Sequence, residues 1–167
     1  LDRVYPTGGF GGAERLPLRT ILERLHEAYS GSLSVEYMYS EDPEVRAWFQ
    51  ERLERGVAKP TREEQLRVLS KLVEAEAFEN FLQTKYLGQK RFSLEGGESL
   101  IPLLDAVLDK AANNDLKGVA IGMAHRGRLN VLTNIAGKSY AQIFREFSGT
   151  AAPYEGGSGD VKYHLGT

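Results

Sequence analysis

The sequence predicts an α/β protein with a mainly helical first segment, residues 1–89, and the incomplete opening of an α/β domain, residues 90–167. Apolar residues recur at helical spacing through most of the first half. In the second half, helical stretches alternate with short apolar runs, a pattern typical of parallel sheets. Two strands cannot complete such a sheet, so we expect a domain that is cut off within this chain.

The first segment opens with the glycine-rich residues 5–12, which we expect to form a loop or linker. No Lys-Ser/Thr pair follows this stretch and no strand precedes it, so a phosphate-binding loop is disfavoured. A helix is expected over residues 17–30, with Pro17 in its first turn and Gly31 beyond its end. Residues 33–39 then alternate enough for a short strand or an extended segment.

Two further helices should begin at recognisable caps. Asp42 is a suitable N-cap for a helix whose first residue is Pro43 and whose end is marked by Gly56. Thr61 and Glu64 have the spacing of a capping box, in which each side chain satisfies the other's backbone N–H. The apolar period that follows indicates a long helix of roughly seven turns.

Helices and strands should alternate in the second half. Residues 118–123 form a short apolar run bounded by glycines, which predicts a buried strand. A glycine-rich loop over residues 149–159 should lead into another strand that begins at Asp160. The other expected elements are a turn at 94–98, helices at 100–108 and 129–136, and a helix opened by a Ser139–Gln142 capping box.

The composition excludes several classes of function. Hydrophobic residues make up 41% and charged residues 26%, as in an ordinary globular protein, and the net charge of −2 gives no general attraction to nucleic acid or anionic membranes. Without cysteine the chain has neither disulfides nor thiolate zinc sites. No apolar run reaches the ~18 residues of a membrane span, and no signal peptide is visible. We expect a cytoplasmic protein that contacts neither nucleic acid nor membranes.

The most informative residues are His125, Arg126 and Arg128, which lie where the predicted strand meets the next helix. A helix N-terminus already carries a partial positive charge, so cations there suggest a bound anion. Ligands of open α/β sheets bind beyond the carboxyl ends of the strands, as here. Alternatively, an arginine pairs with a helix carboxylate such as Glu146, and His125 is an ordinary loop donor.

His164 is the second candidate, near the end of the last expected strand. A histidine of near-neutral pKa can donate to a substrate carboxylate or transfer a proton. It could equally be a surface residue at a strand end. No metal-ligand cluster, carboxylate pair or nucleophile motif is recognisable, so no residue is assigned to a metal.

Three ordered motifs give the chain a recognisable resemblance. They are KRFSLEGGESLIPLLD at 90–105, GMAHRGRLNVL at 122–132 and GSGDVKYHLG at 157–166. Together they resemble the first component of 2-oxoglutarate dehydrogenase, the thiamine-diphosphate-dependent decarboxylating subunit, and weaker similarity extends through nearly the whole chain. The resemblance identifies the α/β domain at 90–167 as the start of a thiamine-diphosphate-binding domain.

The resemblance implies an enzyme that oxidatively decarboxylates 2-oxoglutarate and transfers the succinyl group to lipoyl-lysine of a dihydrolipoyl succinyltransferase, acting as a homodimer in the tricarboxylic acid cycle. Thiamine diphosphate would be bound through Mg²⁺ at the dimer interface. By position in the motifs, His125 and His164 correspond to catalytic, substrate-contacting histidines and Arg126 to a cofactor-contacting arginine. Arg128 would have a supporting role.

The family's Gly-Asp-Gly…Asn metal motif and the glutamate that activates the cofactor are absent from these residues. We therefore expect the metal ligands to lie outside the chain, and the 167 residues alone to be inactive. Two alternatives stay open. One is another phosphate-binding α/β enzyme that uses His125 and Arg126 generically. The other is a non-enzymatic helical interaction module over residues 17–86.

Overall fold

A computed structural model describes residues 1–149 and His164. The chain divides into two compact units, one spanning Leu1–Lys59 and the other beginning at Pro60. The described residues are mostly helical, with one two-stranded antiparallel sheet. The predicted boundary at 89/90 concerns the start of the cofactor-binding domain and stays a prediction, whereas the compact units meet thirty residues earlier.

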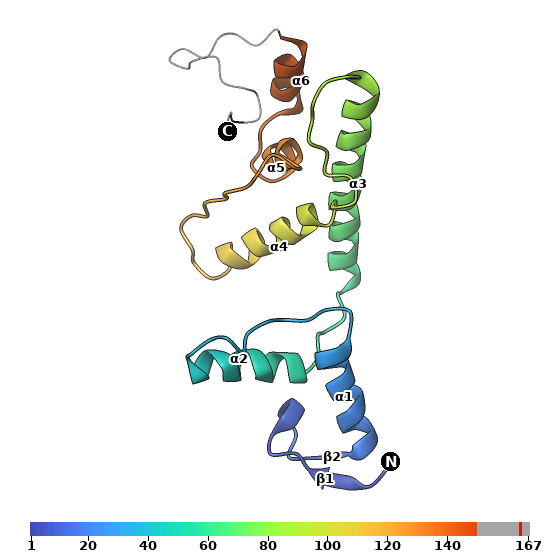
Figure 1. Cartoon of the computed structure of the whole chain (residues 1–167), viewed down its shortest axis with the longest axis vertical. Coiled ribbons are helices and arrows are strands. Elements are labelled where there is room, and N and C mark those ends of the chain that lie inside the picture. The colour runs from blue at the N-terminus through green and yellow to red at the C-terminus, as the bar shows by residue number, and fades with distance from the viewer. Residues whose placement is uncertain (150–163, 165–167) are drawn as a thin grey trace. The chain divides into compact units, whose positions relative to one another are not determined.

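The first unit begins with a hairpin that the sequence pattern did not predict (Figure 1). Strand β1, Val4–Pro6, pairs with β2, Arg15–Pro17, and the short 3-10 helix η1, Phe10–Gly12, lies between them. The expectation that residues 5–12 are only a loop was therefore wrong at both ends. Strands of three residues are too short to show a period of two, and the glycines at positive φ between them dominate the composition.

Helices α1, Leu18–Ser30, and α2, Pro43–Glu54, complete the first unit and confirm two predicted helices. The Asp42 side chain accepts a hydrogen bond from the Glu44 amide, as an N-cap should. Residues 33–39 between the helices form no strand: residues 33–37 have no regular secondary structure, and residues 38–39 form a turn. Tyr37 of this segment is buried and stacks on Phe49 of α2, with ring centroids 5.6 Å apart.

A polar contact joins the two helices of this unit. The Tyr29 hydroxyl of α1 donates to Glu54 Oε1 of α2 at 2.8 Å, and Gln50 Nε2 donates to the same oxygen at 2.9 Å. Desolvation raises the pKa of Tyr29 above its ordinary value of 10.0, and the hydrogen bonds with Tyr37 and Glu54 raise it further. The protonated tyrosine is therefore the form that this unit stabilises.

We expect Tyr29→Phe to destabilise the first unit by about 1 kcal/mol below pH 10, the contribution of one hydrogen bond. Because the folded pKa is raised, the unfolded chain ionises first as the pH rises, and the wild type loses this advantage above about pH 10. The difference between the two proteins should then shrink. Fluorescence of Trp48, the single tryptophan, reports unfolding of this unit during denaturant titrations at pH 8 and pH 11. A difference that grows with pH would contradict the assignment.

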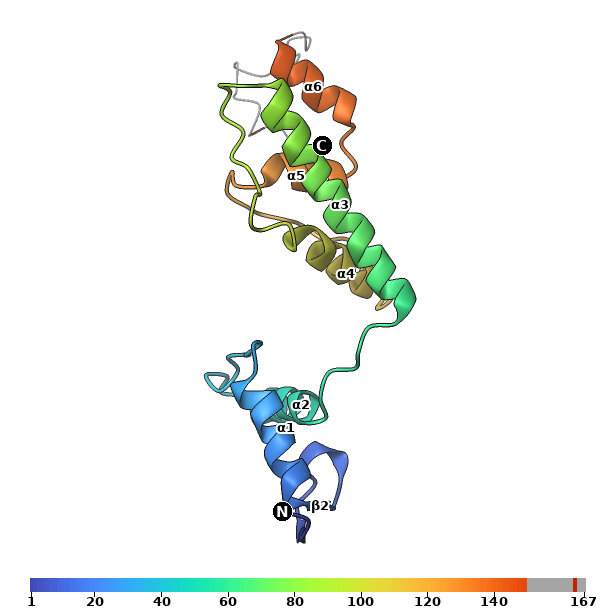
Figure 2. The same ribbon diagram turned by 90° about the vertical axis from the view of Figure 1, so that its right-hand side faces the viewer.

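The second unit is built around a long helix, α3, Arg62–Lys85 (Figure 2). Both predicted capping boxes are present: Thr61 with Glu64 at the start of α3, and Ser139 with Gln142 at the start of α6, Tyr140–Ser148. The hydrogen bonds from Thr61 to the Glu64 carboxylate lower the pKa of Glu64. Helices α4, Leu100–Ala112, and α5, Arg128–Asn134, confirm the remaining helical predictions, with α5 slightly shorter than expected.

Two apolar clusters hold these helices together. In one, Phe78 and Leu82 of α3 pack against α5 and α6; in the other, Ala75 of α3 packs with Leu94, α4 and α5. Helix α3 thus supplies buried side chains to both clusters, so its middle turns organise the unit. No described helix is both long enough and apolar enough to cross a membrane.

The predicted strand at 118–123 is absent from the structure. These residues have no regular secondary structure, and Val119 and Ile121 are exposed. A strand requires a neighbour to pair its N–H and C=O groups, and the residues described after Lys59 contain none. The parallel sheet therefore stays a prediction. The expected loop at 149–159 and the strand from Asp160 lie outside the described residues, apart from Gly149 and His164.

Candidate functional site

His125 and Arg126 lie on a tight turn, residues 125–127 (the site turn), immediately before α5. Gly127 has φ 71°, and its N–H donates to the Phe92 carbonyl at 2.8 Å. The Arg128 N–H closes the turn by donating to the His125 carbonyl at 3.0 Å. A left-handed residue is needed to reverse the chain here, and glycine adopts that conformation without steric cost.

Residues 91–98 run beneath the site turn and touch each of its three residues; we call them the support loop. The Phe92 ring lies 4.9 Å from the His125 ring, and the Glu95 carbonyl accepts from Arg126 Nη2 at 3.0 Å. Leu94 is buried under Gly127, where an added Cβ would lie 2.5 Å from Leu94 Cδ1. The support loop therefore fixes the backbone and the side chains of the turn together.

The structure brings both predicted histidines together, although 39 residues separate them in sequence. The Nε2 atoms of His125 and His164 are 3.0 Å apart, and the ring centroids are 5.1 Å apart. Two imidazole nitrogens at this distance form a hydrogen bond only if one carries a proton and the other does not. One Nε2–H is therefore present in the pair, and a ligand oxygen that displaces the accepting imidazole can take its place as acceptor.

Arg126 projects into solvent from the same turn, and its described partner is a neutral carbonyl. Among the described residues, no carboxylate forms an ion pair with it. A guanidinium has five N–H donors, so most of its donors and its full charge stay available to a ligand. The environment fits an anion with several oxygens, such as a diphosphate or a carboxylate.

Arg128 has a different environment. It is half-buried, donates to the Met123 carbonyl at 3.4 Å, and its Nε has no hydrogen-bond partner within the described part of the chain. Within the described part of the chain, Glu146 pairs with Lys138, its Oε1 2.7 Å from Lys138 Nζ, and no arginine forms an ion pair with it. Helix α5 has only seven residues, so its dipole contributes less to anion binding than a longer helix would. The attraction for an anion at this site therefore comes mainly from the side chains.

The residues that hold the site turn in place are not recognisable from the sequence. The support loop belongs to the first recognised motif, yet no role for its members follows from local sequence. Glu79 and Asn130, which lie deeper, are also buried polar residues that periodicity alone cannot distinguish from the apolar core. A buried charge within a helical pattern is the one signal that could have indicated Glu79. The described residues contain no cluster of three or more potential metal ligands.

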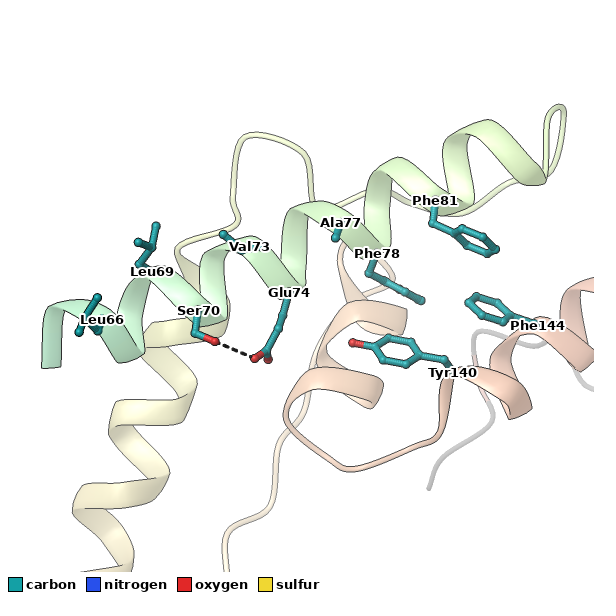
Figure 3. A pocket seen from close by; sticks show the side chains of 10 residues that line it. All are labelled: Leu66, Leu69, Ser70, Val73, Glu74, Ala77, Phe78, Phe81, Tyr140 and Phe144. Atoms are coloured by element: carbon teal, nitrogen blue, oxygen red, sulfur yellow. Dashed lines mark hydrogen bonds between the residues drawn. The ribbon is translucent and has the colours of Figure 1, made fainter. Parts of the chain in front are cut away.

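A second feature of this unit is an apolar groove of about 660 Å³ between α3 and α6 (Figure 3). Figure 3 shows Phe81 of α3 facing Phe144 of α6, and Ser70 bonded to Glu74 within α3. The walls are otherwise almost entirely apolar side chains. The described residues that line the groove therefore present no cationic side chain to an anionic ligand.

Comparison with known proteins gives close relatives over the full length of the chain, while no family model matches it. A "2-oxoglutarate dehydrogenase E1/E2 component" of Corynebacterium glutamicum is 58% identical over 100% of this chain and 14% of its own length. A "multifunctional 2-oxoglutarate metabolism enzyme" of Mycolicibacterium vanbaalenii is 56% identical over 99% of the chain and 13% of its own length. A protein of the same name from Mycobacterium sp. strain JLS is also 56% identical.

The chain thus spans about one seventh of the relatives it matches, as a fragment of such a protein would. The three motifs lie within the matched region, because the match covers the whole chain. The resemblance indicated by the motifs is therefore confirmed: along its entire length, this chain is related to a segment of the 2-oxoglutarate dehydrogenase E1/E2 proteins.

Proposed function

We propose that this chain contributes part of the active site of a thiamine-diphosphate-dependent 2-oxoglutarate dehydrogenase first component. The observation that carries the proposal is that His125 and Arg126 lie on one turn and that His164 reaches it, with its Nε2 3.0 Å from that of His125. The names of the relatives support 2-oxoglutarate as the substrate. The resemblance supports a cytoplasmic homodimer whose cofactor-binding domain starts near residue 90.

The donor set fits the cofactor and the substrate, both of which are anionic. Arg126 would hold the diphosphate, because it is exposed, fully charged and held by a carbonyl rather than a carboxylate. His125 and His164 would face 2-oxoglutarate, which carries two carboxylates. Thiamine diphosphate, bound with Mg²⁺ through ligands outside this chain, supplies the electron sink for decarboxylation when it is present.

The residues of this chain then bind, orient and donate protons. When 2-oxoglutarate binds, one histidine would donate its Nε2–H to a substrate oxygen in place of the other imidazole, and it would regain its proton from that oxygen. The positive charge of Arg126 would stabilise the negative charge that the cofactor and the substrate bring into the site. The succinyl group would pass to lipoyl-lysine of a dihydrolipoyl succinyltransferase partner.

The full-length protein is expected to decarboxylate 2-oxoglutarate, measured as ferricyanide reduction with thiamine diphosphate and Mg²⁺ present. In that protein, His164→Gln should raise KM for 2-oxoglutarate about fivefold, because one hydrogen bond to the substrate is lost. His26→Gln is the matched control, since His26 is exposed on α1. The 167-residue chain alone should be inactive.

Two results would contradict this proposal. A full-length protein that decarboxylates pyruvate but not 2-oxoglutarate would show that the substrate is wrong. An unchanged KM in His164→Gln would remove this histidine from the substrate site.

A further inference from the structure

Glu79 lies on the buried side of α3 and is only 3% exposed. A carboxylate is rarely buried unless its oxygens are satisfied by donors or cations. Glu79 satisfies this condition by reaching two different segments. Its Oε1 accepts from Asn130 Nδ2 of α5 at 3.1 Å, and its Oε2 lies 3.6 Å from Arg91 Nη1, at the start of the support loop.

Asn130 of α5 uses both of its side-chain N–H donors in bonds to α3. It is fully buried, and its Nδ2 also donates to the Ala75 carbonyl of α3 at 3.0 Å. Its Oδ1 accepts from Asn134 Nδ2 at 2.6 Å. Both N–H donors are therefore directed at α3, and the side chain can satisfy them only in this orientation. Asn130 fixes the start of α5, three residues after Gly127, against Glu79.

Arg91 connects Glu79 to the support loop, as Asn130 connects it to α5. Its side chain is only 18% exposed, and it lies between Glu79 and Glu95, at 3.3 Å from Glu95 Oε1. Arg91 immediately precedes Phe92, whose carbonyl accepts from Gly127. Glu95, four residues on, provides the carbonyl that holds Arg126. One carboxylate on α3 therefore connects to both segments that define the site turn.

We propose that Glu79 is a positioning residue that holds the support loop and α5 in register and thereby places Arg126 and His125. This inference rests on the proposed function for its effect on the cofactor. Its effect on the site turn itself follows from the contacts alone. Loss of the Glu79 charge removes the ion pair with Arg91, which keeps its contacts with Glu95 and with the Glu79 carbonyl. Loss of the Oε1 acceptor leaves Asn130 with an unsatisfied donor.

The test uses the full-length protein with Glu79→Gln and Glu79→Leu. The first variant keeps an acceptor for Asn130 but removes the charge that faces Arg91, and the second removes both. Glu146→Gln is the matched control, because it weakens another largely buried carboxylate–cation pair of the described residues, the one with Lys138, and no described contact joins Glu146 to the site turn. The readouts are amide hydrogen exchange over residues 122–128 and the Kd for thiamine diphosphate by calorimetry.

We expect exchange at the site turn to be about tenfold faster in Glu79→Gln and faster still in Glu79→Leu, with the Kd raised about fivefold in Glu79→Gln. Glu146→Gln should change neither quantity at the site turn. Equal effects of Glu79→Gln and Glu146→Gln would overturn the inference, because they would indicate a general loss of stability. If the Glu79 variants fail to fold, Arg91→Gln releases the same link from its more exposed side and must reproduce the faster exchange.

The two hypotheses fail in distinguishable ways. Faster exchange at the site turn with an unchanged Kd, accompanied by an unchanged Kd in Arg126→Ala, would retain Glu79 as a positioning residue and reject the cofactor role of Arg126. A raised Kd in Arg126→Ala, with normal exchange and normal Kd in both Glu79 variants, would retain the proposed function and reject the positioning role.

Discussion

Arg126→Ala in the full-length protein is expected to weaken thiamine diphosphate binding by about ten- to a hundredfold. A hydrogen bond between ionised groups contributes roughly 1.5–3 kcal/mol, and the substitution removes a charged donor from the diphosphate. The fold should be little affected, since the arginine is exposed and its described protein contact is one bond to the Glu95 carbonyl. Isothermal titration calorimetry with thiamine diphosphate and Mg²⁺ measures the change directly.

Two variants separate charge from geometry in this experiment. Arg126→Lys keeps the charge but loses the planar pair of donors, so it should restore only part of the affinity. Arg67→Ala removes another exposed arginine, one that pairs with Asp105 and Asp109 on α4, and should leave the affinity unchanged. An Arg126→Ala protein that binds the cofactor as tightly as wild type would eliminate the diphosphate role.

Gly127→Ala is expected to lower the free energy of opening at the site turn by about 2–5 kcal/mol. The left-handed backbone costs a non-glycine residue roughly 1–2 kcal/mol, and overpacking of a filled core costs roughly 1–3 kcal/mol. Both apply, because Gly127 has φ 71° and the new Cβ would overlap Leu94 Cδ1. Native-state hydrogen exchange in the full-length protein measures the opening at residue 127.

Gly137→Ala provides the matched control. Gly137 has φ 79°, but a Cβ there would meet no atom within 4 Å, so only the backbone cost remains. In the double variant Gly127→Ala with Leu94→Ala, the smaller side chain makes room for the new Cβ, and the two costs should be less than additive. Equal costs at positions 127 and 137, or strict additivity of the double variant, would show that the overlap with Leu94 is unimportant.

Local signals in the sequence accounted for most of the helices. Capping at Thr61 and Ser139 and the proline at position 43 have mechanisms that operate within a few residues, and the structure confirms each of them. The hairpin formed by β1 and β2 could not be predicted from the sequence pattern, because its strands are too short to show alternation. The apolar residues and bounding glycines at 118–123 predict a strand, but they cannot reveal whether a partner strand is present.

The candidate site was predictable only in part, for a similar reason. His125, Arg126 and His164 could be named from motifs, and the structure places the two histidines in contact. What holds them is a set of long-range contacts, between Phe92 and Gly127, Glu95 and Arg126, and Glu79 and Asn130. No local pattern encodes pairs that lie more than thirty residues apart in the chain.

Helix α3 contributes residues to both apolar clusters, and this has a practical consequence for the choice of truncated forms of the protein. A recombinant piece that starts at residue 90 would retain the histidines and Arg126 but lose Ala75, Phe78 and Glu79. It would expose the apolar faces of α5 and α6 and leave Asn130 without its acceptors. A recombinant version of the second unit should therefore begin at or before Pro60, because α3 supplies the buried side chains and the acceptors that hold the segments carrying the motifs.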